Sequence, residues 1–378
     1  MRTNKIWIVI YVALWLWGLQ SCDNLHSTTP PDEINMVVGT YTDTISEGLY
    51  SFRFDQTSGK ATSMGLMRLA NPSYLTFSSD GRKIYVISES NDDTDALSVL
   101  TFNKKNGAMR FVDSLHIPFA GPCYIEADTG MIFTANYGEG SISEFLVRNN
   151  KLDSIRTLVT GSYGGPDTIR QAEPHIHCVQ FSPKHDYLFA TDFSGDQLLR
   201  FSYNRERIKE FKPFPLHIDA GPRHFVFNKE GTFIYLMNEL SCKVTVLRYK
   251  EGNVETIQEI NTDTVNARGG ADIHLSPDGN FLYASNRLNH DGIAIFSVNK
   301  ANGLIKKVGY QPTYRHPRHF NITPNGKYLL CACRDDNRIQ VFKRDEKTGL
   351  LTDTKQDIQV GRPVCIQFTD TLYAKPHK

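Results

Sequence analysis

An excess of either charge sign is missing from this chain of 378 residues, because 42 lysines and arginines are balanced by 41 aspartates and glutamates. The formal net charge is only +1. Proteins that bind nucleic acid or anionic membrane surfaces usually carry a basic excess. Charge runs and low-complexity tracts are also missing after about residue 35. We therefore expect no nucleic-acid partner, and no contact with lipid through the folded part of the chain.

Common catalytic and metal-binding motifs are missing too. The chain has no GxSxG, no HExxH, no phosphate-binding P-loop and no GxGxxG after a strand. Beyond residue 22 it has six cysteines, and none forms a CxxC pair typical of structural zinc sites. We expect no cofactor, and we expect these cysteines to be buried free thiols: Cys123, Cys178, Cys242, Cys331, Cys333 and Cys365.

A long repeat is what the chain does contain. Each copy starts with Pro, a polar or aromatic residue and an alternating apolar run, then passes through a Gly turn into a second strand, as in FNKEGTFIYLMNE after Pro222. The copies lie 46 to 52 residues apart and begin at Pro72, Pro122, Pro174, Pro222, Gly270, Pro317 and Pro363. This period of strands and Gly turns predicts an all-β propeller with one four-stranded blade per repeat.

The two ends of the repeat region are complementary halves of one copy. Residues Met36 to Phe54 match only its back half, and residues Pro363 to Tyr373 match only its front half. A blade built from both termini would pair the last strand with the first and leave no free sheet edge. We therefore predict a seven-bladed β-propeller over residues 36–373 as a single domain, closed by both chain termini.

The first residues have the pattern of an export signal. Arg2 and Lys5 precede an apolar stretch from Ile6 to Leu19, which has the length of a signal-peptide core and is short for a membrane span. An ordinary cleaved signal and a membrane anchor are the alternatives.

The stretch Leu19-Gln20-Ser21-Cys22 resembles the lipobox of bacterial lipoproteins, although Gln20 is not the usual small residue. We predict that residues 1–22 direct export, that Cys22 carries a lipid, and that residues 23–35 form a tether. The protein would then be exported and held on a bacterial membrane by this lipid alone, facing the periplasm or the cell envelope.

Polar residues cluster at corresponding places in neighbouring repeats. Because the second strand of a blade runs antiparallel to the first, its end lies at the same face as the beginning of the first strand. If the first strand is the innermost, both places border the mouth of the central channel. The side chains expected to form a polar pocket there are His175, His177, Arg223, Glu239, Asp272, His274, Arg287 and Arg318.

These residue types suit the hydrolysis of an ester or a lactone. Arginine pairs with carboxylate or phosphate through two parallel hydrogen bonds, which favours an anionic substrate. Histidine and glutamate can exchange protons near neutral pH, and we expect burial to raise the pKa of Glu239. Such a reaction needs a base for water, cationic donors for the carbonyl oxygen, and an acid for the leaving alkoxide.

A metal centre is the alternative for the same residues. His175 and His177 lie one residue apart on a strand and could chelate a metal together with Asp272 and His274. Neighbouring arginine side chains would repel a divalent cation. We therefore expect no metal.

Several stretches closely resemble a known family. They are NPSYL at Asn71 to Leu75, ANYGEGSISEF at Ala135 to Phe145, RQAEPHIH at Arg170 to His177, AGPRHFVF at Ala220 to Phe227, NEL at Asn238 to Leu240, ADIHLSPDG at Ala271 to Gly279, SNR at Ser285 to Arg287 and HPRHF at His316 to Phe320. The chain resembles, over about residues 36 to 370, the seven-bladed propeller lactonases, which include bacterial 6-phosphogluconolactonase and fungal carboxy-muconate lactonizing enzyme.

The resemblance implies hydrolysis of 6-phosphoglucono-1,5-lactone to 6-phosphogluconate without a metal. The positions usually discussed as active in that family fall on His175, Arg223, Glu239 and Arg287. On this basis Glu239 or His175 would be the base on water, and the two arginines would stabilise the oxyanion. The residues expected to bind the substrate are His177, Asp272, His274 and Arg318, the last two at its anionic group.

Export conflicts with the phosphorylated substrate, because that lactone arises in the cytosol. Three hypotheses follow. The first is a lactonase acting on this or an unphosphorylated sugar-acid lactone, and the second is a cycloisomerase that forms a lactone from an unsaturated dicarboxylate. The third is a propeller without catalytic activity that binds a carbohydrate or a protein.

Overall fold

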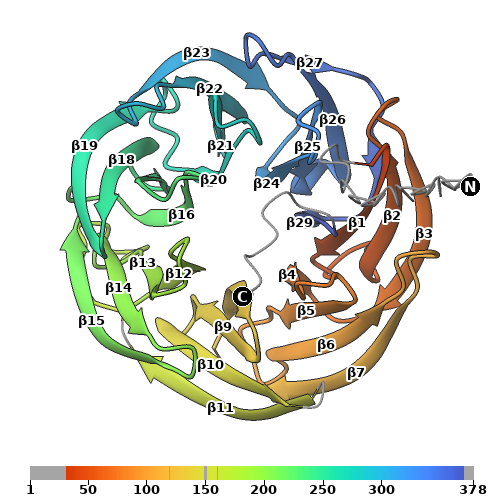
Figure 1. The fold of residues 1–378 in the computed structure, drawn as a ribbon, viewed down its shortest axis with the longest axis horizontal. Coiled ribbons are helices and arrows are strands. Elements are labelled where there is room, and N and C mark those ends of the chain that lie inside the picture. Colours follow the sequence, from red (N-terminus) through yellow and green to blue (C-terminus); the bar gives the residue numbers. More distant parts are fainter. Residues whose placement is uncertain (1–30, 119, 149–150, 160, 370–378) are drawn as a thin grey trace, which may run out of the picture.

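Seven sheets stand around a central axis in the computed structural model, which describes residues 31–369 except 119, 149–150 and 160 (Figure 1). Cys22, the predicted signal peptide and most of the predicted tether lie outside the described residues. In the described part of the chain, no helix is long and apolar enough to cross a membrane. The six cysteines beyond residue 22 are buried and free, which confirms that prediction.

Each blade has four positions from the hub to the rim. The inner strands are β29 (Pro363–Phe368), β4 (Pro72–Phe77), β8 (Pro122–Asp128), β12 (Ile176–Phe181), β16 (Pro222–Phe227), β20 (Gly270–Leu275) and β24 (Pro317–Ile322). The second strands are β1 (Glu33–Thr40), β5 (Lys83–Ser88), β9 (Met131–Asn136), β13 (Tyr187–Asp192), β17 (Phe233–Asn238), β21 (Phe281–Asn286) and β25 (Tyr328–Cys333).

The third and outer strands complete the blades. The third strands are β2 (Gly48–Asp55), β6 (Ala96–Phe102), β10 (Ser141–Arg148), β14 (Gln197–Tyr203), β18 (Lys243–Lys250), β22 (Gly292–Val298) and β26 (Arg338–Arg344). The outer strands are β3 (Ala61–Arg68), β7 (Met109–His116), β11 (Lys151–Val159), β15 (Ile208–Pro215), β19 (Asn253–Asn261), β23 (Ile305–Pro312) and β27 (Leu351–Asp353), with β28 (Ile358–Gln359) also on β26. A short 3-10 helix, η1 (Arg334–Asp336), links β25 to β26.

Burial follows the position of a strand in its blade. The second strand β17 is buried along its whole length, because its blade is covered on both faces by neighbouring blades, whereas the outer strand β19 alternates between half-buried and exposed residues. Aromatic rings pack between blades, as where Phe133 of β9 meets Phe181 of β12 edge to face with 5.5 Å between the ring centroids. The inner strands of adjacent blades contact one another around the whole hub. The prediction that the first strand of each repeat is innermost is confirmed.

The ring closes between the two ends of the chain. Strand β29 pairs antiparallel with β1, so that Met36 lies opposite Phe368 and Val38 lies opposite Ile366. This confirms the predicted seventh blade and its position. Strand β1 begins at Glu33, so the strand takes in three residues expected in the tether, and residues 370–373 of the predicted domain lie outside the described residues.

Every inner strand has a bulge just after its start. In β16, Pro222 lies opposite Asn238 and His224 lies opposite Met237, which leaves Arg223 without a partner residue. The same shift in register occurs in all seven inner strands. A bulge redirects the side chain of its extra residue and is frequent beside active sites. We call the second residues of the inner strands the bulge ring: Ser73, Cys123, His177, Arg223, Ala271, Arg318 and Val364.

Candidate active site

Glu239 lies among three arginines at the mouth, the end of the channel where the inner strands begin. It follows β17 directly, and its Oε2 is 3.0 Å from Nε of Arg223. Its Oε1 is 2.9 Å from Nη2 of Arg287 and also contacts Nη2 of Arg170. The structure therefore brings Arg223, Glu239 and Arg287 together, as expected from the sequence.

Backbone carbonyl groups hold two of these arginines in place. Arg223 donates from Nη1 to the carbonyl oxygen of Ala271 at 2.6 Å. Arg287 donates to the carbonyl oxygens of Gly269 and Gly270, at 3.3 and 3.2 Å. Both side chains are almost completely buried, so their guanidinium groups are fixed before any ligand arrives.

The charge of Glu239 differs from the sequence-based expectation. Burial does act to raise its pKa, but Arg287, Arg223 and Arg170 outweigh this and lower the pKa to about 2. Burial also lowers the pKa of Arg287, to about 9. The expectation of a raised pKa for Glu239 was wrong, because a single carboxylate faces three cations. At neutral pH Glu239 is an ionised counter-charge and a weak base.

Arg170 also belongs to the arginine cluster around Glu239, although it is not among the candidate site residues expected from the sequence. It belongs to the segment before β12, and its Nη1 donates to the carbonyl oxygen of Arg268 at 2.8 Å. Arg268 forms ion pairs with Asp219 and with Asp167, each at 2.7 Å. These pairs join the loops that precede β20, β16 and β12. The stretch RQAEPHIH contains Arg170, but the repeat pattern indicates only its two histidines, which lie at the start of the strand.

Arg318 is held far more loosely than Arg223 and Arg287. Its Nη2 is 3.8 Å from Oε1 of Glu89, beyond hydrogen-bond distance, and its guanidinium carbon lies 5.5 Å from the ring centroid of Tyr41. The hydroxyl of Tyr41 donates to the same Glu89 oxygen at 3.0 Å. Among the arginines of the mouth, Arg318 is therefore the one whose donors are most available to a ligand.

A small pocket lies on the floor of the mouth between Arg223 and Arg318. Its cavity is about 10 Å³, close to the space that one water molecule needs. Most of its lining comes from the bulge ring and the residues directly after it: Ser73, Tyr74, Cys123, Arg223, His224, Arg318, His319 and Val364, with Glu89. Two guanidinium groups beside one oxygen-sized space are suited to hold an anionic oxygen.

His175 lies just before β12, in the blade next to that of Arg223, and does not itself line this pocket. Its Nδ1 is 2.6 Å from the carbonyl oxygen of Tyr137, and its ring stacks on the Tyr137 ring with 3.9 Å between centroids. Since a carbonyl oxygen only accepts, Nδ1 carries the proton and Nε2 keeps its lone pair. Burial lowers the pKa of His175, so the ring is neutral at pH 7 and its Nε2 can take a proton.

His177 is a buried neighbour of the same cluster. Its Nδ1 lies 3.8 Å from Sγ of Cys123, and its ring centroid is 5.3 Å from that of His224. Burial holds the pKa of His177 well below its usual range. It is a neutral ring in the wall between the mouth and the deeper channel, and its predicted contact with substrate stays a prediction.

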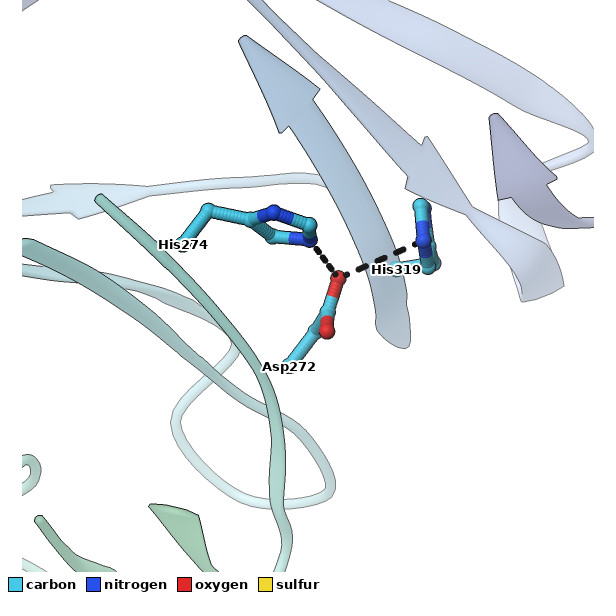
Figure 2. Close-up of side chains that lie close together, drawn as sticks. All are labelled: Asp272, His274 and His319. Atoms are coloured by element: carbon cyan, nitrogen blue, oxygen red, sulfur yellow. Dashed lines mark hydrogen bonds and ion pairs between the residues drawn. The ribbon is translucent and has the colours of Figure 1, made fainter. Parts of the chain in front are cut away.

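Asp272 lies one residue deeper than the bulge ring, among three histidines. Its Oδ1 accepts from Nδ1 of His224 at 2.8 Å, and its Oδ2 accepts from Nε2 of His274 at 3.0 Å. Nε2 of His319 lies 3.6 Å from Oδ2, as drawn in Figure 2. The backbone N–H of Phe320 also donates to Oδ2, at 3.1 Å. Burial opposes the charge, but the histidines hold the pKa of Asp272 well below its usual range.

The group Asp272, His274 and His319 has its ligand atoms within 4.8 Å of one another, so it is the natural place to test for a metal. His319 accepts the backbone N–H of Ile366 at its Nδ1, at 3.2 Å. The neutral ring therefore carries its proton on Nε2, the atom that would have to ligate the metal. Burial lowers the pKa of His319 to about 4, so the ring is neutral at pH 7. The arrangement fits a carboxylate surrounded by N–H donors and does not fit a cation.

His274 does not lie where the sequence predicted it. It lines a separate cavity of about 230 Å³ at the other end of the channel, together with Asn321, Gln367 and Glu126. Two residues along a strand span about 7 Å, which carries His274 past Asp272 and away from the mouth. His274 and Arg318 therefore line different cavities, and their joint contact with one anionic group stays a prediction.

Together, fold and site define a seven-bladed propeller with an arginine-rich, histidine-flanked pocket at one end of its hub. The chain matches the model of the family described as lactonase, 7-bladed beta-propeller, over residues 35–368. It belongs to that family.

Named relatives agree with this. A protein from Formosa agariphila named 6-phosphogluconolactonase is 35% identical over 348 residues, which are 88% of this chain and 99% of the relative. A crystal structure of a protein from Bacteroides uniformis, provisionally assigned as a 6-phosphogluconolactonase, has 51% sequence identity and a TM-score of 0.86. The match covers 89% of this chain and 100% of the chain in that structure. A periplasmic gluconolactonase from Pseudomonas aeruginosa has 29% identity and a TM-score of 0.83, covering 89% and 99%. The chain is a 6-phosphogluconolactonase-like propeller.

Proposed function

We propose that this protein hydrolyses a six-membered sugar-acid lactone, 6-phosphoglucono-1,5-lactone or its unphosphorylated counterpart, to the open-chain acid. The observation that carries the proposal is the pocket lined by Arg223 and Arg318, with the neutral ring of His175 at the start of the neighbouring blade. It offers cationic donors for a carbonyl oxygen and a base for water within one mouth. The names of the family members at 35% and 29% identity support the substrate class.

The reaction needs one base and a place for negative charge. A water molecule loses a proton to Nε2 of His175 while its oxygen bonds to the lactone carbonyl carbon. The carbonyl oxygen becomes an oxyanion, which Arg223 and Arg318 stabilise. The ring C–O bond then breaks, and the protonated His175 returns the proton to the leaving ring oxygen. The new carboxylic acid ionises, so each turnover releases one proton to the solvent.

In this scheme Glu239 positions the arginines and neutralises their mutual repulsion. Its pKa of about 2 leaves it unable to hold a proton at neutral pH. Arg287, which bonds to Glu239 and to two backbone carbonyls, is likewise a positioning residue. Of the two candidates that the sequence left open, we therefore propose His175 as the base.

The test is proton release by the full chain, purified in detergent, with freshly made gluconolactone and 6-phosphogluconolactone in parallel. Arg318→Gln should lower kcat/KM on the order of 100-fold or more, the usual effect of losing one oxyanion donor. Arg315→Gln is the matched control, because that arginine is exposed and its side chain contacts Asp336 and the carbonyl oxygen of Asp335, outside the pocket lining. Wild-type rates no faster than spontaneous hydrolysis, on both lactones, would refute the function.

We also propose export and lipid attachment at Cys22, which rest on the sequence alone. Support comes from Arg2 and Lys5, the apolar stretch Ile6 to Leu19, and the lipobox-like residues before Cys22. An exported lactonase would meet unphosphorylated lactones. Cells grown with labelled palmitate should label the wild type and leave Cys22→Ala unlabelled. Label in both proteins, or in neither, would contradict lipid attachment at this residue.

A further inference from the structure

The hydroxyl of Ser73 stands unpaired inside the mouth pocket. Ser73 is the second residue of β4 and therefore occupies the same bulge position as Arg223 and Arg318. It is 3% exposed and lines the pocket with both arginines. Its Oγ is shielded from solvent and has no hydrogen-bond partner in the structure. Buried hydroxyl groups nearly always have one, so this oxygen requires an explanation.

Several other buried hydroxyl groups do have partners. Thr191 donates to the carbonyl oxygen of Arg223 at 2.9 Å, and Ser194 donates to that of Glu173 at 2.5 Å. Thr40 donates to the carbonyl oxygen of Gly48 at 2.7 Å. The bulge places Ser73 away from such carbonyl groups and turns it toward the channel.

The groups around the pocket are mostly donors. Arg223 and Arg318 bring two guanidinium groups to this lining, while Nε2 of His319 faces Asp272 at 3.6 Å. The one carboxylate, Glu89, already accepts from Tyr41 and faces Arg318. A space rich in donors, with room for about one oxygen atom, is complementary to an oxygen that bears negative charge.

We propose that Ser73 is a third donor to the lactone carbonyl oxygen, acting with Arg223 and Arg318 as that oxygen gains charge. This inference rests on the proposed function and adds a residue to its site. Ser73 lies in the same ring of bulge residues as the two arginines, and the three residues line one pocket from three blades. The carboxylate oxygen of the product occupies the same point after ring opening.

The proposal is tested by Ser73→Ala in the full chain. We expect kcat/KM for gluconolactone to fall on the order of 100-fold, as for other single oxyanion donors, while Tm stays at the wild-type value. Stability should not fall, because the variant removes a polar atom that has no partner. Ser241→Ala is the matched control, since its Oγ is also buried and unpaired but does not line the pocket, and it should keep the wild-type rate.

Two results would overturn the proposal. One is a wild-type rate in Ser73→Ala. The other is a loss of rate accompanied by a lower Tm, which marks a structural role. Calorimetric binding of gluconate separates this inference from the proposed function. If the wild type hydrolyses neither lactone, weaker gluconate binding by Ser73→Ala still supports Ser73 as a hydrogen-bond donor to a carboxylate oxygen in this pocket. Equal binding by both proteins, or no binding by the wild type, overturns it.

Discussion

Oε1 of Glu239 lies 2.9 Å from Nη2 of Arg287, and both side chains are almost completely buried. Replacing Glu239 by Gln leaves Arg170, Arg223 and Arg287 around a neutral amide. Removing one partner of a buried ion pair typically costs about 3–5 kcal/mol of unfolding free energy. We expect a loss of this size in urea unfolding, together with reduced turnover.

Glu89→Gln is the control for this experiment. Glu89 faces one arginine at 3.8 Å, so its replacement should cost about 1 kcal/mol or less. A Glu239→Gln protein with wild-type stability and no activity would contradict the positioning role and favour Glu239 as the base.

The pH profile reports on the base. Burial and the neighbouring Arg170 lower the pKa of His175 from its usual 6.5, although Tyr137 and Glu173 act against them. The neutral ring is the active form, so kcat/KM should fall as the pH drops through a pKa below 6.5 and stay level from there to pH 8. The measurement is initial proton release across pH 4.5 to 8 after subtraction of spontaneous hydrolysis. A rate that still climbs steeply above pH 7 would contradict this assignment.

Asp192 should make stability depend on pH in the opposite sense to most carboxylates. It accepts the N–H groups of Gly195 and Ser162 at 3.0 and 3.1 Å, and burial raises its pKa to about 6 from 3.8. Between these values the folded protein keeps a proton that the unfolded chain has lost. The stabilising contribution of Asp192 to the free energy of unfolding is therefore nearly complete below about pH 4 and is lost as the pH rises through about 6.

Asp192→Asn removes this titration. Relative to the variant, the wild type should lose about 2.4 kcal/mol of unfolding free energy between pH 4 and pH 7. Urea unfolding of both proteins at four pH values in this range measures the difference. A difference that does not change with pH would show that Asp192 is ionised throughout.

The hydrogen bonds around Asp272 predict that the protein needs no metal there. Nδ1 of His319 accepts from Ile366, which leaves the proton on the atom facing Asp272. Treatment with EDTA should leave Tm and turnover unchanged, and added zinc should not raise Tm. A zinc-dependent rise in Tm in the wild type that disappears in His274→Ala would contradict this reading.

The sequence predicted the fold because each repeat carries its own turn and strand pattern, and the complementary halves at Met36 and Pro363 required closure. It placed Arg223 and Glu239 together because antiparallel strands return to the same face. It misplaced His274, since depth along a strand decides which cavity a side chain reaches. Arg170 was missed because its position depends on the contacts of Arg268, far away in the sequence.

Two further features could not be read from the sequence. The low pKa of Glu239 follows from the number of arginines that meet in space, which no single repeat reveals. The proposed role of Ser73 depends on a bulge in β4. In the sequence Ser73 is only a small residue at a position where other repeats carry Arg or His. Both features arise from how seven similar strands converge on one axis.

The pairing of β29 with β1 also fixes when activity can appear during biosynthesis. The strand that completes the hub is the last described strand of the chain, so a nascent protein remains an open arc until Phe368 has left the ribosome. Val364, on that strand, lines the same pocket as Arg318 and Ser73. A premature stop codon anywhere before Pro363 therefore removes the pocket wall along with the ring closure. Enzymatic turnover therefore requires translation at least through β29.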